Sequence, residues 1–354
     1  MTDEAQIPND HGPHDIPGEL RFEEAGLKIS SEVDLTALAT SFVRVGKRGT
    51  TWDLPRRFEN YKPASPVELS VAGAAPKFIL RSKRDSDDWY IVKSAEKWGA
   101  VETLTELLNN RLGAALGFPM AHAGVLRVDG ALCFASHNFQ RPGETLIHGS
   151  LLFREVFDDE LEGVGKKRWD EQRTYDIELI NEMLGKLCGE SGNGLMERLI
   201  EMLIFDALIG SMDRHMQNWG VLATVSEPRT YRFAPIFDSA RALLWNQDEG
   251  KLKVLQKQAG ALEAYLNRAS PIMGCASTGQ PVNHFGLVEH LIVRFPDPVL
   301  KALNRIDPPR VRKASHIVRQ FPFNREYSRL RASLITKILQ LRADRLHQIA
   351  TGRR

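Results

Sequence analysis

The chain has 354 residues, about twice the usual length of a domain, so we expect one bilobal unit or two modest domains. Its 42% hydrophobic and 26% charged residues, with 47 Lys and Arg against 45 Asp and Glu, are ordinary for a globular chain and exclude global disorder and fibrous structure. No apolar stretch approaches the roughly 18 residues of a membrane span, and the acidic, proline-containing start is unlike a signal peptide. We therefore expect a cytoplasmic protein without a membrane partner.

The first part of the chain predicts a tail followed by a small sheet. Residues 1–60 lack a long periodic run, and we expect a tail and small extension whose role the sequence does not give. In residues 61–141, the short apolar runs VELSVAG, KFILRSK and WYIVKSA are separated by turns and predict antiparallel strands. The runs HAGVLRV and ALCFAS follow as a hairpin joined at Asp129-Gly130.

One helix interrupts this sheet at about residues 101–116. Its apolar residues recur at three- and four-residue spacing, and a Gly and a Pro follow its end. These apolar positions are Val101, Leu104, Leu107, Leu108, Leu112 and Leu116. The spacing predicts a helix.

Helical periodicity dominates residues 142–354. We expect helices at about 170–188, 194–211, 284–294, 309–321 and 325–349. One segment breaks this pattern, WGVLATVSEPRTYRFAPI, which predicts a single β-hairpin around a polar turn. The predicted fold is therefore α+β, with a small β-rich lobe that holds one helix and a larger α-helical lobe.

Basic residues are concentrated at the end of the chain. From Lys301 to Arg354 there are 14 basic residues and three acids, which makes this segment about +11 and the rest about −9. A basic surface attracts phosphate backbones or an acidic partner, whereas the alternative is the solvated face of a C-terminal helix pair. Direct binding of nucleic acid stays open at this point.

Polar residues that suit metal binding flank the predicted hairpin. Asp213 and Asn218 stand before its first strand, and Asp238 follows its second strand. Because the two strands fold back on each other, we expect these oxygen-bearing side chains to meet at one end, where Mg²⁺ finds the ligands it prefers. The spacing of Asp213 and Asn218 is also that of the catalytic loop of protein kinases. The alternative is that these residues only form turns and caps.

The first lobe offers positive groups for a phosphate. Lys93 ends the run WYIVK, and Glu106 in the following helix is its expected partner, with Glu102 as the competitor. Residues 70–77, SVAGAAPK, form a small-residue turn whose backbone N–H groups can approach phosphates closely. Taken alone, the lysine is a strand-end residue and the small-residue segment is a β-turn.

Together these segments resemble the HipA-type serine/threonine kinases, the toxins of bacterial HipBA-like toxin–antitoxin systems. The segments are SVAGAAPKF, the Lys93 strand, TELLNNRLGAALGF, SMDRHMQNWGVL and FAPIFDSA, in this order. The resemblance covers roughly residues 65–350, and its most specific part is a DxHxxN element followed by APxxD. It implies a two-lobed protein-kinase-like fold that uses ATP with Mg²⁺.

The resemblance also implies residue roles. Asp213 would be the catalytic base, Asn218 and Asp238 the metal ligands, Lys93 the phosphate-binding lysine and Glu106 its partner in the helix. ATP would contact a set of residues in the first lobe and the linker between the lobes. These are Ser70, Val71, Ala72, Gly73, Ala74, Lys77, Lys93 and Phe139, and Ser70 occupies the position of the family's autophosphorylated serine.

The chain departs from the family pattern in two places. It has only about 60 residues ahead of the kinase-like part, so it resembles the shorter HipT-like kinases, in which the missing subdomain is a separate HipS-like polypeptide. SHNFQR stands where the family has ERFDR, and His137 and Gln140 replace acids there. The side chains at the adenine site therefore differ from the family pattern, whereas the backbone groups that would bind adenine do not depend on them.

The resemblance further implies partners and a substrate class. These are a HipB-like DNA-binding antitoxin and a protein substrate such as an aminoacyl-tRNA synthetase. Two other readings stay open: a catalytically weak module that binds an antitoxin or nucleic acid, and a kinase for a small molecule or lipid on the same fold.

Overall fold

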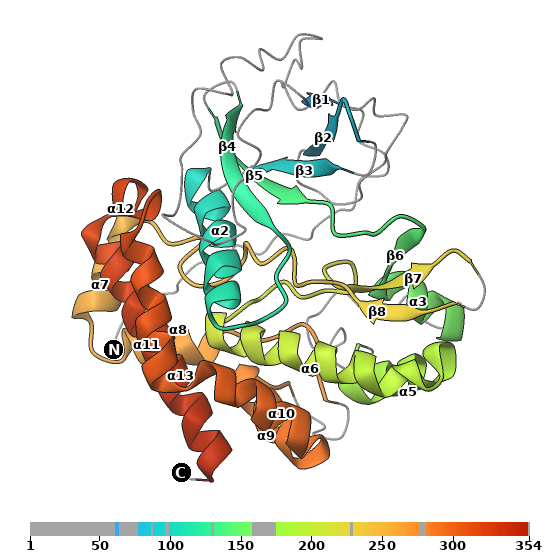
Figure 1. Cartoon of the computed structure of the whole chain (residues 1–354). Helices are drawn as coiled ribbons and strands as arrows, with labels where there is room; N and C mark the ends of the chain where they lie inside the picture. The colour runs from blue at the N-terminus through green and yellow to red at the C-terminus, as the bar shows by residue number, and fades with distance from the viewer. Residues whose placement is uncertain are drawn as a thin grey trace, which may run out of the picture.

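A five-stranded antiparallel sheet, in the order β1-β2-β3-β5-β4, forms the first lobe (Figure 1). Its strands are β1 (Tyr61–Pro63), β2 (Lys77–Ser82), β3 (Trp89–Ser94), β4 (Ala123–Val128) and β5 (Ala131–His137). The predicted strands at KFILRSK and WYIVKSA and the β4–β5 hairpin are confirmed, with Val128 paired to Ala131 across the predicted turn.

The computed structural model describes a defined part of the chain. It covers residues 61–63, 77–85, 88–95, 99–128, 131–157, 175–226, 229–275 and 281–352. The predicted extension at 1–60, the strand VELSVAG, the site residues from Ser70 to Ala74 and the turn at Asp129-Gly130 lie outside these residues.

The two faces of the sheet pack against different neighbours. On β5, Cys133 and Ala135 point into a small core that also holds Leu80 and Val92. Phe134, between them, points to the opposite face and packs with the leucines of α2. This alternation is the two-residue period of a strand with both faces covered.

Helix α2 (Ala100–Ala115) is the predicted helix of the first lobe, and it connects the two lobes. Its leucines belong to one continuous core that includes the central helix of the second lobe, α6 (Ser191–Ile209). On another side, Arg111 Nη1 donates to the Phe321 carbonyl at 2.8 Å, and the Thr105 hydroxyl lies 3.5 Å from the Tyr327 hydroxyl. The helix is therefore held by the sheet and by the C-terminal helices at once.

A second, three-stranded sheet lies at the start of the helical lobe. Its strands are β6 (Glu144–His148), β7 (Gly220–Thr224) and β8 (Tyr231–Phe233), in the order β6-β7-β8. The predicted hairpin is confirmed as β7 and β8, but its prediction as a lone hairpin was wrong, because β6 pairs with β7 and places Leu146 opposite Leu222. The short strand β6 is defined by this partner rather than by a pattern of its own.

The rest of the second lobe is helical, as predicted. Its elements are α3 (Gly149–Phe157), α5 (Ile177–Cys188), α6, α7 (Glu249–Lys257), α8 (Ala261–Arg268), α9 (His284–Arg294), α10 (Pro296–Leu303), η4 (Asn304–Ile306), α11 (Pro308–Ser315), η5 (His316–Arg319), α12 (Phe323–Glu326) and α13 (Arg329–Thr351). Helix α9 has the predicted bounds. No described helix combines the length and apolar character that crossing a bilayer requires.

Four helices of the second lobe differ from the predicted bounds because of local caps and turns. Helix α5 begins at Ile177 rather than at about 170, after its cap at Asp176, and α6 spans Ser191–Ile209 rather than 194–211. The helix expected at 309–321 is α11 followed by the short 3-10 helix η5. The last helix begins at Arg329 rather than 325, because the Ser328 hydroxyl accepts a hydrogen bond from the Arg331 backbone N–H at 3.0 Å and caps it.

Candidate active site

The site begins at the end of β3, where Lys93 points toward α2. The Lys93 ammonium lies 3.0 Å from Glu106 Oε1, and the Glu106 side chain is buried. Of the two glutamates considered from the sequence, Glu106 therefore makes this contact. Lys77, at the start of β2, is the register partner of Lys93 across the ladder. Two ammonium groups thus stand side by side at this end of the sheet.

Asp238 brings a second carboxylate to the same lysine from the other lobe. Its Oδ1 lies 3.2 Å from the Lys93 ammonium, and its backbone adopts a positive φ of 55°. Burial alone would raise the pKa of Asp238, but the positive charges of Lys93 and Lys77 outweigh it and lower this pKa to about 2. Asp238 is therefore ionised at neutral pH.

The charges of Asp238 and Glu106 also affect the pKa values of the two lysines. Burial alone would lower the pKa of Lys93, but the two carboxylates raise this pKa above its ordinary value. The pKa of Lys77 is lowered by its burial and by the charge of Lys93. The pKa of Glu106 is raised by burial, against the effect of Lys93. The site thus holds two carboxylates and two amines, and the charge of each group affects the pKa values of the others.

Asp213 and Asn218 lie in the loop that follows α6. The helix ends at Gly210, which has a φ of 67°, and the Asn218 side-chain amide donates to the Asp213 carbonyl at 2.7 Å, which closes the loop. The Asp213 carboxylate is 3.4 Å from Arg241 Nη1. Burial raises the pKa of Asp213, while Arg241 opposes this rise. A carboxylate with a raised pKa and partial exposure suits a proton acceptor.

Arg214, which the sequence analysis did not single out, fastens this loop to the Asp238 segment. Its guanidinium is 1% exposed and donates two hydrogen bonds to the Asp206 carboxylate, at 2.8 and 2.9 Å. Its Nη1 donates to the carbonyls of Asn218 and Phe237, at 2.7 and 2.6 Å, and its Nη2 donates to the Ser239 hydroxyl at 3.1 Å. One buried side chain therefore holds both loops.

The sequence carries a signal for this clamp that is visible in retrospect. Asp206 is a carboxylate inside the apolar run of α6, and Arg214 lies next to Asp213. A carboxylate in the middle of a buried helix needs a cationic or hydrogen-bonding partner, because an unpaired buried charge is costly. The sequence does not say which cation meets it.

Helix α2 and the segment after it anchor the Asp238 segment from the first lobe. Asn109 Nδ2 donates to the Ser239 carbonyl at 2.7 Å. The Ile236 N–H donates to the Pro119 carbonyl at 2.7 Å, and the Ala121 N–H donates to the Ile236 carbonyl at 3.2 Å. These bonds position Asp238 beside the Lys93–Glu106 pair.

Phe139 lies in the linker between β5 and β6. Its ring stacks on that of Phe237, with a centroid distance of 5.7 Å, next to Asp238 in sequence. The Phe139 carbonyl accepts a hydrogen bond from Arg232 Nη2 at 2.7 Å, and Arg232 also pairs with Glu144. These contacts therefore fix the linker to β8, which precedes the Asp238 segment in the chain.

The predicted site residues thus fall into three groups. Lys77, Lys93, Glu106 and Asp238 come together where the two lobes meet. Asp213 and Asn218 share one loop, which Arg214 joins to the Asp238 segment, and Phe139 packs on the same segment. The predicted loop residues Ser70, Val71, Ala72, Gly73 and Ala74 lie outside the described residues.

The donor set fits magnesium better than a softer metal. Asp238 is an ionised carboxylate, and the Asn218 amide nitrogen is used inside its own loop, so the amide oxygen is the atom that can contact a cation. Mg²⁺ needs only one or two protein oxygens, because water and phosphate oxygens complete its shell. In the described part of the chain, no group of three or more His, Cys, Asp or Glu gathers as a metal cluster.

Comparisons with solved structures identify the fold. The crystal structure of the Helicobacter pylori proinflammatory kinase CtkA is similar, with a TM-score of 0.66 and 19% identity over 83% of this chain and 96% of that chain. A chain of the Shewanella oneidensis MR-1 toxin–antitoxin complex of HipA, HipB and operator DNA is similar with a TM-score of 0.52 and 14% identity, over 84% of this chain and 75% of that chain.

Among curated proteins, none matches the chain. The two structural likenesses establish the α+β, kinase-like fold that the sequence predicted. The family model for the HipA-like C-terminal domain matches residues 69–285, which is well over half of the chain and contains every predicted site residue. The chain belongs to the HipA-like family.

Proposed function

We propose that the protein is an ATP-dependent serine/threonine protein kinase of the HipA type. The observation that carries this proposal is the Lys93 ammonium held between Glu106 of the first lobe and Asp238 of the second. Phosphoryl transfer needs a fixed cation for the phosphate oxygens and a carboxylate that can hold a metal, and this contact places both at one point. The lobe boundary would lie near residue 141.

Asp213 would accept the proton of the substrate hydroxyl. In this step the hydroxyl oxygen forms a bond to the γ-phosphorus, the bond from that phosphorus to the bridging oxygen breaks, and ADP leaves with the electron pair. The raised pKa of Asp213, caused by burial, suits a carboxylate that takes up a proton during the reaction. Arg241, at 3.4 Å, orients the carboxylate.

Asn218 and Asp238 would hold Mg²⁺, and the remaining predicted residues would hold ATP. A bound magnesium ion supplies charge neutralisation to the phosphate oxygens. Lys93 and Lys77 lie at the same end of the sheet and would bind phosphate oxygens, together with the backbone of residues 70–74. Phe139, in the linker that stacks on Phe237, would lie against the adenine.

The finer parts of the proposal follow from family membership. The substrate would be a protein such as an aminoacyl-tRNA synthetase, and the chain would act as the toxin of a toxin–antitoxin pair. Its partners would be a HipB-like DNA-binding antitoxin and a separate HipS-like subunit. Ser70 would be phosphorylated by the protein itself, which would add negative charge beside the phosphate site and weaken ATP binding.

A phosphate-transfer assay with Mg²⁺ and ATP tests the proposal. We expect Asp213→Asn to lower self-phosphorylation and phosphorylation of a cell lysate by at least about a hundredfold, the scale of losing a general base. The matched control is Glu197→Gln, which removes an exposed carboxylate on α6 and should leave the rate unchanged. Equal labelling by wild type and Asp213→Asn would overturn the assignment.

Mass spectrometry of the labelled protein tests the regulatory part separately. We expect phosphate on the peptide that contains Ser70, and its loss in Ser70→Ala without loss of activity on lysate proteins. Phosphate on other peptides only would remove Ser70 from the proposal and would leave the kinase assignment standing.

A further inference from the structure

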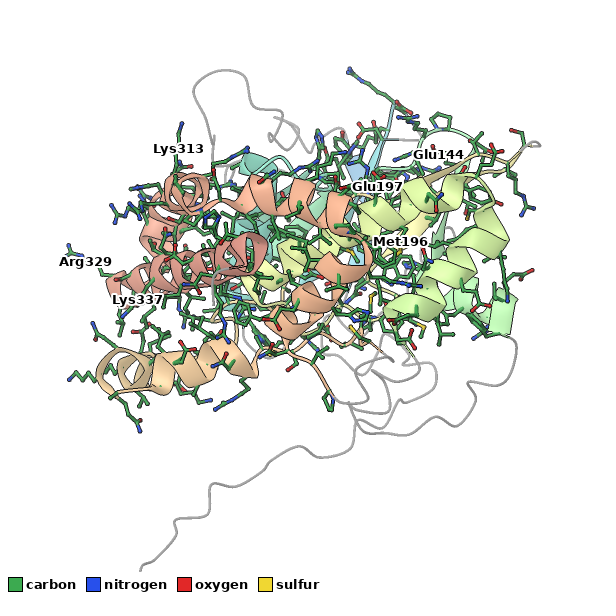
Figure 2. The ribbon with its side chains drawn as sticks, turned by 90° about the horizontal axis from the view of Figure 1, so that it is seen from below. Glu144, Met196, Glu197, Lys313, Arg329 and Lys337 are labelled. Atoms are coloured by element: carbon green, nitrogen blue, oxygen red, sulfur yellow. The ribbon has the colours of Figure 1, made fainter. Side chains whose placement is uncertain are left out.

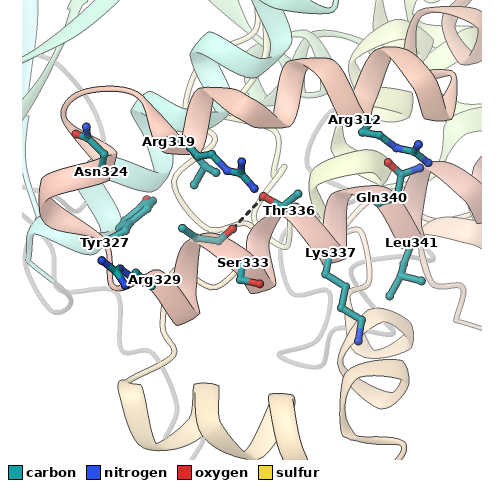
Figure 3. A pocket seen from close by; sticks show the side chains of 12 residues that line it. Arg312, Arg319, Asn324, Tyr327, Arg329, Ser333, Thr336, Lys337, Gln340 and Leu341 are labelled. Carbon is teal, nitrogen blue, oxygen red and sulfur yellow. Dashed lines mark hydrogen bonds between the residues drawn. The ribbon is translucent and has the colours of Figure 1, made fainter.

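A groove of about 690 Å³ lies between α13 and the segment that runs from α11 to α12 (Figure 3). Four basic side chains line it: Arg312 from α11, Arg319 from η5, and Arg329 and Lys337 from α13. The hydroxyls of Ser333 and Thr336 and the amides of Asn324 and Gln340 stand between them. Its lining contains no carboxylate.

Four other basic residues between Lys301 and Arg354 have structural partners. Arg331 and Arg342 are buried and donate to main-chain carbonyls of the helical lobe. Arg305 and Arg345 pair with glutamates, at 2.9 and 3.1 Å. These residues explain part of the positive charge at the end of the chain as fold-stabilising contacts.

The four groove residues differ from these. Arg312, Arg319, Arg329 and Lys337 are exposed, and their side chains make no hydrogen bond or ion pair within the described part of the chain. In Figure 2, Arg329 and Lys337 lie on the same side of the molecule as Lys313, away from Glu144 and Glu197. Such unneutralised charge along one groove favours an anionic occupant.

The floor of the groove distinguishes between two classes of anionic occupant. Val318 and Tyr327 are buried beneath it, and Ala332 and Leu341 are partly exposed within it, so apolar surface lies between the cations. Single-stranded nucleic acid needs exposed aromatic rings on which its bases stack, but the only aromatic residue in this lining, Tyr327, is 7% exposed. A phosphate backbone alone would leave the apolar floor uncovered.

We propose that this groove binds an acidic polypeptide segment of a partner protein, with apolar side chains between its carboxylates. Guanidinium groups form paired hydrogen bonds with carboxylates, and the apolar side chains would cover Ala332 and Leu341. The residues of α13 from Arg329 to Gln340 extend over about 17 Å along the helix axis. This length corresponds to about three turns of an amphipathic helix. This inference goes beyond the proposed function and does not depend on it.

Fluorescence anisotropy on the full chain tests the proposal. The probe is a fluorescein-labelled peptide of about 16 residues with Glu and Leu on opposite helix faces, at physiological ionic strength. We expect the charge reversal Arg319→Glu/Lys337→Glu to weaken its binding at least about tenfold, because both reversed groups would repel the carboxylates. The matched control Arg294→Glu/Lys301→Glu makes the same charge change at exposed sites on α9 and α10 and should alter binding less than about twofold.

Two further probes separate the alternatives. A peptide with Ser in place of Leu keeps the charge and should bind about tenfold more weakly, because it loses burial on the apolar floor. A single-stranded RNA of similar charge should bind more weakly than the Leu peptide. Tighter binding of the RNA, with its loss in the groove variant, would overturn the polypeptide assignment in favour of nucleic acid.

Other results would overturn the site itself. These are equal weakening by the groove and control variants, equal affinity for the Leu and Ser peptides, or no saturable binding of the Leu peptide. Thermal unfolding of each variant shows that it is folded, and the milder pair Arg319→Gln/Lys337→Gln replaces the reversal if it is not. Self-phosphorylation should stay unchanged in the groove variant, which separates loss of docking from loss of catalysis.

Discussion

At the scale of single residues, the pair of Arg214 and Asp206 decides the geometry of the site. Both side chains are 1% exposed, and the arginine donates hydrogen bonds to carboxylate, carbonyl and hydroxyl oxygens. Removing one member of a buried ion pair leaves an uncompensated charge, whereas replacing both by apolar residues of similar size is often neutral for stability. Stability and positioning can therefore be separated by experiment.

We expect Arg214→Met to lower the free energy of unfolding by about 3–5 kcal/mol, because Asp206 is left buried without its partner. The double variant Asp206→Leu/Arg214→Met should recover most of this loss. Its phosphate-transfer kcat should stay low, because methionine cannot hold the carbonyls of Asn218 and Phe237. Urea unfolding and steady-state kinetics measure the two effects.

The result that contradicts this role is a double variant that regains both stability and wild-type kcat. Arg214 would then serve the fold alone. A selective rise in KM with unchanged kcat would contradict it too, because displacing the proposed catalytic residue Asp213 should weaken transition-state stabilisation.

Asp238 gives a prediction for the pH dependence of stability. Its folded-state pKa is about 2, because Lys93 and Lys77 outweigh burial, whereas an unfolded Asp has a pKa of about 3.9. A group with a lowered folded pKa stabilises fully above the unfolded value and loses this contribution as the pH falls through the folded value. The contribution of Asp238 should therefore fade between about pH 4 and pH 2.

The measurement compares urea unfolding of wild type and Asp238→Asn across this range. Asparagine has the same shape and tolerates the positive φ of this position. The stability difference should be constant from pH 7 to about pH 5 and should shrink below pH 4. A difference that grows as the pH falls would mean that the carboxylate is not held by the lysines.

Several site residues were predictable one by one, but their connections were not. The positions of Lys93, Glu106, Asp213, Asn218 and Asp238 follow from motifs and spacing along the chain. The Arg214 clamp joins segments from α6, the loop and the end of the hairpin, and only the folded chain brings these together. Sequence spacing carries no information on such long-range pairing.

At the scale of elements, the end of α6 determines where the loop that holds Asp213 and Asn218 begins. Gly210 has a φ of 67°, in the left-handed region, and a Cβ there would approach Ala269 and Arg342 at 3.4 Å. We expect Gly210→Ala to lower the free energy of unfolding by about 1–2 kcal/mol, because an L-residue pays this for the left-handed conformation. Thermal or urea unfolding provides the measurement.

The matched control for this change is Gly185→Ala in α5. A Cβ there meets nothing within 4 Å, and the residue is inside the helix, so Ala should raise the free energy of unfolding by up to about 1 kcal/mol. Opposite signs at the two glycines are expected. A stabilising Gly210→Ala would show that the helix does not need this termination.

Two of the elements that the sequence analysis missed have weak periodic signals. Helix α7 buries only Leu252, so its remaining residues show no apolar stripe from which a helix can be predicted. Strand β6 has five residues, most of them half-buried, and its pairing with β7 defines it. By contrast, α2 and α9 were predicted closely because their large apolar residues recur with the helical period.

At the scale of the whole molecule, the continuous core predicts joint unfolding of the two lobes. The leucines of α2 pack in the same cluster as α6, and α2 is also bonded to the C-terminal helices. We expect one calorimetric transition, in which the loss of helix and the change in tryptophan fluorescence coincide. Two separate transitions would show that the sheet, with its own small core, unfolds independently.

The Arg214 Nη1 atom links two stretches of chain that are distant in sequence. One nitrogen donates to the carbonyls of both Asn218 and Phe237. The distance between the two carbonyl oxygens therefore cannot exceed the combined length of these two hydrogen bonds. A shift of either stretch is therefore transmitted to the other. The two proposed metal ligands, Asn218 and Asp238, would approach or leave an ion as a unit.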